Sequence, residues 1–197
     1  MGRLSMFNLV SLDGFFAGPG GEIDWFQTDD EFEQFAIEHT GQAQHLLFGR
    51  VTYELMASYW PTEEAAASEP EIARLMNTLP KTVFSRTLHE VTWENARLAR
   101  DGAADEVARL KRETDGDIFL FGSADLAATL TAAGLLDEYR LIVNPVVLGR
   151  GKPLFRGDRR LDLRLTGERR FGNGNLLLTY EPTEKADEGR IAGHRAA

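Results

Sequence analysis

The sequence contains no cysteine among its 197 residues, which excludes disulfide bonds, a thiol nucleophile and any metal site built on cysteine ligands. No apolar run approaches the ~20 residues that span a bilayer. The apolar stretch at the N-terminus is interrupted by Asn8, Ser11 and Asp13, unlike a signal peptide. We therefore expect a cytoplasmic protein.

Basic residues are scarce relative to acidic ones. There are 22 Lys and Arg against 31 Asp and Glu, which gives a formal net charge of −9. This balance argues against nonspecific binding to nucleic acid or membranes, although a local basic pocket for a phosphate stays compatible with it. The four histidines show no metal-ligand spacing, and we expect no metal site.

The length and composition are those of one globular domain. The chain is 43% hydrophobic and 27% charged, so it can bury a sizeable core without cross-links. From residue 183 onward it becomes polar, with little apolar content. We expect a domain over residues 1–182 and a disordered tail over 183–197.

Strand and helix patterns alternate along this domain. We predict strands over residues 4–12, 46–48, 81–86, 118–121, 139–148, 161–171 and 176–180, and a weaker strand at 91–93. We predict helices over 28–44, 52–59, 64–77, 103–113 and 124–134. Thr28 and Glu31 form a capping-box pattern for the first helix. The run Gly172-Asn173-Gly174-Asn175 predicts a hairpin. The expected fold class is α/β, with three layers and a mostly parallel mixed sheet that ends in an antiparallel hairpin.

Three of these strands end in residues suited to binding an anion. The strand ends carry Gly49-Arg50, Ser85-Arg86 and Gly122-Ser123. Ligands of open α/β sheets bind at the carboxyl ends of the strands, where helix N-termini attract phosphate. Gly122 lets a ligand approach the backbone closely. The alternative is an ordinary strand-to-helix turn with solvated arginines.

Two families share these motifs. The stretches 46–54, 82–86 and 119–123 resemble the cofactor-binding strand ends of dihydrofolate reductase. The stretches 11–14, 134–138 and 145–155 resemble the reductase domain of the riboflavin-biosynthesis deaminase-reductase. The resemblance covers the chain before the tail. Because no zinc deaminase module is present, the chain resembles a stand-alone member.

The resemblance implies an eight-stranded sheet with an NADPH site at its parallel strand ends. The residues that it assigns to the cofactor are Leu9, Phe16, Gly49, Arg50, Thr52, Ser85, Arg86, Gly122, Ser123, Ala124, Asp125 and Leu126. Arg86 is expected to bind the ribose 2′-phosphate. Ser123 replaces the family's second glycine, and its hydroxyl could cap the helix that starts at Ala124 or reach a phosphate. By the same resemblance we predict a cis Gly122–Ser123 peptide.

The resemblance also implies a carboxylate near the start of the first helix that binds the substrate ring. Counting forward from Trp25 gives Asp30, and counting back from Gly49 gives Glu33. The two lie three residues apart and share a helix face. Simple electrostatics at a helix start is the alternative role. Asp13 is a third candidate, better explained as a turn residue before a glycine.

These features predict an NADPH-dependent reductase of a small heterocycle, such as a pyrimidine or a pterin. The alternative is a non-catalytic protein that keeps the nucleotide site. We also expect a homodimer, because the apolar strand 139–148 falls near the C-terminal edge in chain order and related reductase domains pair there.

Overall fold

The computed structural model describes residues 1–100, 102–156 and 160–183, so most of the predicted tail lies outside the described residues. Its strands are β1 (Arg3–Ser11), β2 (Phe15–Ala17), β3 (Ala43–Gly49), β4 (Lys81–Phe84), β5 (Ala96–Ala99), β6 (Asp117–Phe121), β7 (Glu138–Asn144), β8 (Lys152–Pro153), β9 (Leu163–Arg170) and β10 (Leu176–Pro182). Its helices are α1 (Asp30–Gly41), α2 (Arg50–Tyr59), α3 (Glu63–Ser68), α4 (Pro70–Thr78), α5 (Ala103–Glu113) and α6 (Ala124–Ala132).

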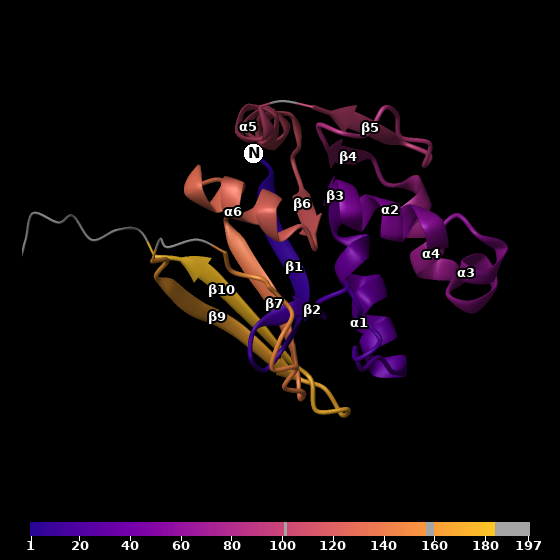
Figure 1. Ribbon diagram of the computed structural model, residues 1–197. Coiled ribbons are helices and arrows are strands. Elements are labelled where there is room, and N and C mark those ends of the chain that lie inside the picture. Colours follow the sequence, from indigo (N-terminus) through magenta and orange to yellow (C-terminus); the bar gives the residue numbers. More distant parts are fainter. Residues whose placement is uncertain (101, 157–159, 184–197) are drawn as a thin grey trace, which may run out of the picture.

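The main sheet has eight strands in the order β5-β4-β3-β6-β1-β7-β10-β9 (Figure 1). The six strands from β5 to β7 run parallel, and β10 and β9 add an antiparallel hairpin. This confirms the predicted fold class. The strand predicted at 139–148 is β7, which ends before Pro145 and lies between β1 and β10. The edge of the sheet on that side is therefore β9, and this corrects the expectation on which the dimer was based.

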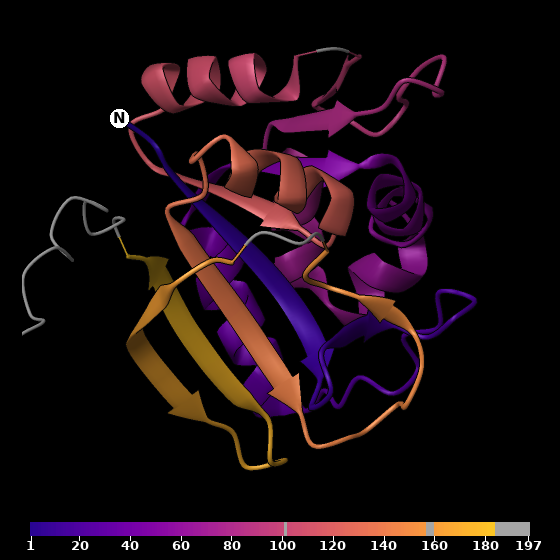
Figure 2. The ribbon, with the colours of Figure 1, turned by 60° about the vertical axis from the view of Figure 1, so that its left-hand side comes forward.

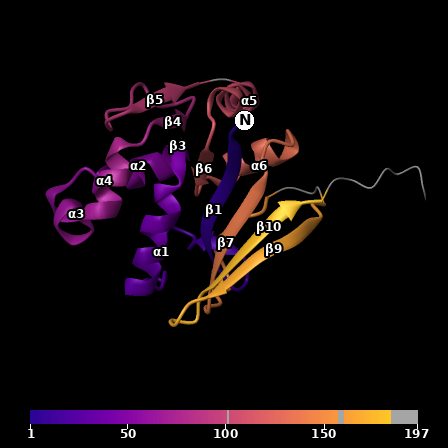
Figure 3. The same cartoon turned by 180° about the vertical axis from the view of Figure 1, so that it is seen from behind.

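Helices cover both faces of the sheet (Figures 1 and 3). On one face α5 and α6 pack on buried side chains such as Leu4 and Leu120. On the other face α2 and α4 pack around Phe48, and α1 packs around Phe7. Figure 2 shows α6 in front of the parallel strands, α5 above it and α1 behind the strands. No helix among the described residues is long and apolar enough to cross a membrane.

Three local predictions were wrong. Asp29 caps α1 by accepting the Phe32 N–H, so the expected capping box does not form. The helix predicted at 64–77 is two helices, because the residue before Pro70 is disfavoured from helical geometry. The fifth strand is Ala96–Ala99 and not 91–93. Trp93 is buried instead as a core side chain beside Phe48.

Candidate functional site

The C-terminal ends of β4, β3 and β6 lie side by side at the same end of the sheet, because these three strands are parallel neighbours. Gly49 closes β3 and is the N-cap residue of α2. Ser123 follows β6 and is the N-cap residue of α6. The starts of two helices therefore meet at these strand ends, which is a favourable place for an anion.

Four of the predicted cofactor residues are brought into contact here. The Gly49 N–H donates to Ser123 Oγ at 2.7 Å, and that hydroxyl lies 3.1 Å from Thr52 Oγ1 and 3.0 Å from the Phe121 carbonyl oxygen. A Cβ on Gly122 would lie 2.7 Å from Thr52 Oγ1. Glycine is therefore required at position 122 for the two helix starts to approach each other.

The Gly122–Ser123 turn differs from the prediction in two ways. Its peptide bond is not cis. The chain turns instead through two left-handed residues, with φ of 56° at Gly122 and 59° at Ser123. The Ser123 hydroxyl also does not cap α6, because its hydrogen bonds go to the start of α2 and to the Phe121 carbonyl. A left-handed serine costs about 1–2 kcal/mol, which the contacts of its hydroxyl can offset.

Two exposed arginines lie at the same strand ends. Arg50 pairs with Glu54 one helical turn away, at 2.8 Å. Arg86 has no hydrogen bond or ion pair with any residue that the structure describes. Ser85 shapes the turn after β4, since its Oγ accepts the N–H groups of Thr87 at 3.1 Å and Leu88 at 3.0 Å. Of these side chains, the Arg86 guanidinium is the one available to an anion without breaking an existing bond.

The remaining predicted cofactor residues are more dispersed. Ala124 and Leu126 lie on the buried face of α6, so only their backbone can face a ligand. Asp125 is exposed and pairs with Arg156 at 2.8 Å. Leu9 and Phe16 are both half-buried, but Leu9 packs in the cluster under α1 and Phe16 in the cluster under α6. The structure does not bring these two side chains together.

The two candidate catalytic carboxylates share one cavity. Asp30 and Glu33 line a space of about 440 Å³ between the start of α1, the end of α2 and the start of α4. Neither carboxylate has a hydrogen bond or ion pair with another described residue. The full lining is Thr28, Asp29, Asp30, Phe32, Glu33, Ala36, Tyr59, Trp60, Glu69 and Ile72. Two unpaired carboxylates are therefore available to a ligand there.

This cavity adjoins the strand ends through shared side chains. Phe32 lines the cavity and also packs in the same cluster as Leu9 and Phe121. Phe121 is the last residue of β6, directly before Gly122. The first turn of α1 and the candidate phosphate site are thus connected through one layer of apolar side chains.

Sequence reasoning missed the far wall of this cavity. The Tyr59 hydroxyl donates to the Glu69 carboxylate at 2.9 Å, and this bond raises the pKa of Tyr59. Glu69 directly precedes Pro70, which begins α4. A helix start predicted at Pro70 would have pointed to Glu69 as a residue near the cavity.

Asp13 ties two loops together and does not line the cavity. Its carboxylate accepts the Ser11 hydroxyl at 2.7 Å and the N–H groups of Leu148 and Gly149 at 3.1 and 2.8 Å. These bonds, chiefly the one from Ser11, lower the pKa of Asp13. The structure thus supports the interpretation of Asp13 as a turn residue.

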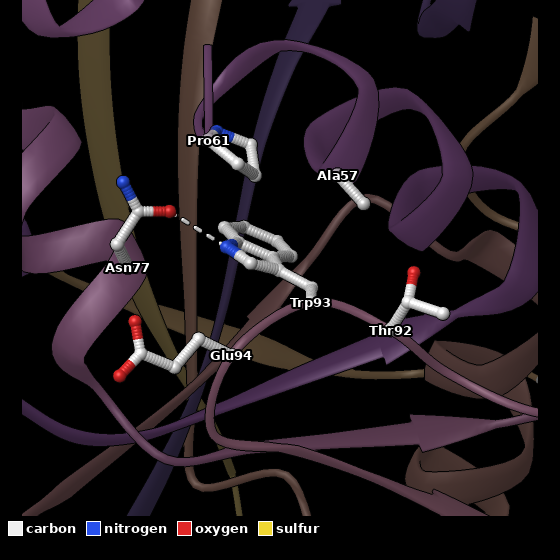
Figure 4. A pocket seen from close by; sticks show the side chains of 6 residues that line it. All are labelled: Ala57, Pro61, Asn77, Thr92, Trp93 and Glu94. Atoms are coloured by element: carbon white, nitrogen blue, oxygen red, sulfur yellow. Dashed lines mark hydrogen bonds between the residues drawn. The ribbon is translucent and has the colours of Figure 1, made fainter.

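A second cavity of about 440 Å³ contains none of the predicted site residues (Figure 4). Its lining is Ala57, Pro61, Asn77, Thr92, Trp93 and Glu94. The Trp93 Nε1–H donates to Asn77 Oδ1 at 2.7 Å, so the buried polar groups there satisfy each other. The tyrosine hydroxyl of Tyr53 accepts the backbone N–H groups of Thr92 and Trp93. These contacts explain the polar side chains around the second cavity as part of the folded structure.

The comparisons with known proteins agree with this architecture. Residues 3–177 match the RibD C-terminal domain family. Uncharacterized protein YyaP of Bacillus subtilis is 38% identical over 179 residues, which covers 90% of this chain and 94% of YyaP. Uncharacterized protein YwjB of the same organism is 30% identical over 180 residues, covering 87% and 94%.

Solved structures share the fold at low identity. A putative riboflavin biosynthesis protein from Shewanella sp. PV-4 superposes with a TM-score of 0.71 at 22% identity, covering 92% of this chain and 99% of that one. A pyrimidine reductase-like protein from Corynebacterium diphtheriae gives 0.69 at 13% identity, with 93% and 92% coverage. A bifunctional deaminase and 5-amino-6-(5-phosphoribosylamino)uracil reductase from Thermotoga maritima gives 0.68 at 14%, with 92% of this chain and 57% of that one. The chain belongs to the RibD C-terminal domain family.

Proposed function

We propose that this chain is an NADPH-dependent reductase of a small amino-substituted heterocycle, and that it acts in the cytoplasm as a homodimer. The observation that carries the proposal is the contact of Gly49, Thr52 and Ser123 at the ends of adjacent parallel strands, with Arg86 unpaired beside them. In a member of this family, such a site is suited to a phosphorylated cofactor.

The described residues fit the cofactor. Gly122 has no side chain, so the backbone at this turn can approach a pyrophosphate closely. A Cβ at this position would also collide with Thr52 Oγ1. The starts of α2 and α6 would bind that pyrophosphate, and Arg86 would pair with the ribose 2′-phosphate. NADPH, when bound, would supply the hydride. No residue of the chain needs to form a covalent bond in this scheme.

The charge of the cavity supports a substrate without phosphate groups. Four of its lining residues are Asp or Glu, and none is Lys or Arg: the carboxylates belong to Asp29, Asp30, Glu33 and Glu69. Like charges in a partly enclosed site repel, whereas ring N–H and amino groups can donate to carboxylates. The aromatic side chains of Phe32 and Trp60 offer faces against a planar ring. We therefore expect a neutral or cationic amino-heterocycle.

A non-catalytic binding protein is the second candidate, and two observations favour it. The Gly49 N–H already donates its hydrogen bond to the Ser123 hydroxyl, so it is not free to donate to a phosphate oxygen. The turn also lacks the cis peptide expected from dihydrofolate reductase. Such a protein would bind the cofactor without transferring its hydride.

Binding followed by turnover separates the two candidates. We would titrate NADPH by tryptophan fluorescence and then follow its oxidation with dihydrofolate, an aminopyrimidine and the ribose phosphate derivative of that aminopyrimidine. A reductase of the proposed kind oxidises NADPH with the unphosphorylated aminopyrimidine in preference to its phosphate ester. Binding without oxidation of any substrate would favour the second candidate, and absence of binding would contradict both.

A further inference from the structure

The backbone at Gln27, just before α1, is held on both sides by asparagine side chains. The Gln27 N–H donates to Asn144 Oδ1 at 3.0 Å. The Gln27 carbonyl accepts from Asn175 Nδ2 at 2.7 Å and, less closely, from Asn173 Nδ2 at 3.3 Å. Asn144 ends β7, and Asn175 lies in the turn between β9 and β10. Both side chains are fully buried, which is uncommon for asparagine. Two distant segments of the chain thus hold the backbone of one residue on both sides.

The same turn also contacts the first turn of α1. The Glu31 carboxylate accepts the Gly172 N–H at 2.8 Å and a hydrogen bond from Arg169 at 3.1 Å. Both bonds lower the pKa of Glu31, so the carboxylate stays charged. The Arg169 guanidinium in turn lies 4.7 Å from the centre of the Phe171 ring. Figures 1 and 2 show the tip of the hairpin beside the start of α1.

The burial of Asn175 does not follow from fold stability alone. Its Oδ1 has no hydrogen-bond partner among the described residues. A buried amide oxygen without a partner carries a free-energy cost that an apolar side chain would avoid. The contribution of this side chain is therefore the bond from its Nδ2 to the carbonyl of Gln27.

We propose that the hairpin turn, residues 171–175, is a positioning element for the substrate cavity. By holding Gln27 and Glu31 it fixes the first turn of α1, and so it sets where Asp30 and Glu33 face the cavity. The functional part of this inference rests on the proposed reductase activity. Asn175 is the main positioning residue, because its side chain makes the shorter bond to the Gln27 carbonyl. Its side chain makes no hydrogen bond to a residue of the cavity or of the strand ends, so it would act only through α1.

The substitution Asn175→Asp tests the proposal with almost no change in shape. It removes the shorter of the two hydrogen bonds to the Gln27 carbonyl, leaves the one from Asn173 Nδ2 at 3.3 Å, and places a carboxylate against the carbonyl oxygen. Asn95→Asp is the matched control, because Asn95 Nδ2 donates to the carbonyls of Asn77 and Thr78 at 3.3 and 3.2 Å in an exposed turn elsewhere. For both variants we would measure amide hydrogen exchange, NADPH affinity, and kcat and KM for the aminopyrimidine.

We expect exchange of the Phe32 and Glu33 amides to accelerate by about tenfold in Asn175→Asp, with kcat/KM falling by a similar factor. NADPH affinity should stay the same, and Asn95→Asp should change none of these quantities. If Asn175→Asp fails to fold, Glu31→Gln replaces it, with Glu38→Gln as control on the same helix. Glu31→Gln keeps an acceptor for Gly172 and loses the charge opposite Arg169, so it should shift the same quantities in the same direction.

Unchanged exchange at Phe32 and Glu33 would overturn the proposal, as would faster exchange with unchanged kcat/KM. An equal response in the control would also overturn it, because the effect would then not be specific to the hairpin turn. If the unsubstituted protein oxidises no NADPH while exchange responds as expected, the proposed function fails and the hairpin contact stands.

Discussion

The Gly49 N–H donates a hydrogen bond to the Ser123 hydroxyl at 2.7 Å, which links the start of α2 to the start of α6. The serine is held in the left-handed region, with φ of 59°, to make this contact. The hydroxyl thus occupies the amide that a cofactor phosphate would use.

Two substitutions of Ser123 should therefore show separately how its left-handed backbone and its hydrogen bonds affect stability and cofactor binding. Ser123→Gly relieves the left-handed strain and frees the Gly49 amide, whereas Ser123→Ala keeps the strain and loses the hydrogen bonds. We expect the glycine variant to be more stable than the alanine variant by about 1 kcal/mol and to bind NADPH several-fold more tightly than the unsubstituted protein. Urea unfolding and fluorescence titration measure the two effects. An alanine variant as stable as the glycine variant would contradict this account.

Asp30 and Glu33 should be needed for turnover and not for cofactor binding. Both line the cavity without a partner among the described residues, so their removal leaves no buried charge unpaired. We expect Asp30→Asn combined with Glu33→Gln to lower kcat/KM by about 10²-fold or more, on the scale of general acid–base contributions. The NADPH affinity of this double variant should match that of Glu38→Gln. Unchanged rates in the double variant would exclude both carboxylates from the reaction.

Stability should fall in mild acid because two histidines are buried in their neutral forms. Burial, and next the positive charge of Arg140, lowers the pKa of His39 to about 3. Burial first, with Arg97, lowers that of His45 to about 4. The unfolded chain therefore takes up protons below pH ~6.5 that the folded chain does not. His39 alone should cost about 1.4 kcal/mol per pH unit between pH ~6.5 and its folded pKa.

Chemical denaturation as a function of pH tests this expectation. His39→Phe replaces the imidazole within an existing aromatic cluster, where it lies 4.5 Å from Phe7 and 4.2 Å from Phe119 between ring centres. The variant should lose less stability than the unsubstituted protein between pH 6.5 and 4. Parallel pH profiles for the two proteins would show that His39 is not protonated on unfolding.

The oligomeric state should depend on the free edge of the sheet. The edge strand β9 carries Leu165, which is 47% exposed. We expect a dimer by light scattering at micromolar concentration, and Leu165→Glu should shift it to monomer if β9 forms the interface. Exposed apolar residues on an open strand edge favour pairing with a second chain. A monomeric unsubstituted protein would refute the dimer.

The sequence predicted the architecture better than the site. Periodicity located α5 at its observed bounds and β6 closely, because buried strands and amphipathic helices have strong local signals. It failed at 91–93, where Trp93 is buried by tertiary packing and not by a strand. It also joined α3 to α4 across Pro70, although the residue before a proline disfavours a helix.

The site depended on contacts that no local pattern reveals. The bond between Gly49 and Ser123 joins residues 74 apart in the chain, and Glu31 pairs with Arg169 instead of completing a capping box. The order of the motifs was sufficient to predict that Gly49, Thr52, Gly122 and Ser123 lie close together. The partners of each side chain, and hence the left-handed Ser123, required the three-dimensional structure.

The most direct test of the central claim compares NADPH with NADH. Arg86 is exposed beside the strand ends without a partner among the described residues, so no existing ion pair would have to break for it to bind the proposed 2′-phosphate. We expect the unsubstituted protein to bind NADPH at least about tenfold more tightly than NADH, since a charge-assisted contact contributes ~1.5–3 kcal/mol. Arg86→Ala should abolish this preference, and Arg112→Ala, which removes an exposed arginine on α5, should retain it. Equal affinities for the two cofactors, or a preference that survives in Arg86→Ala, would contradict the account.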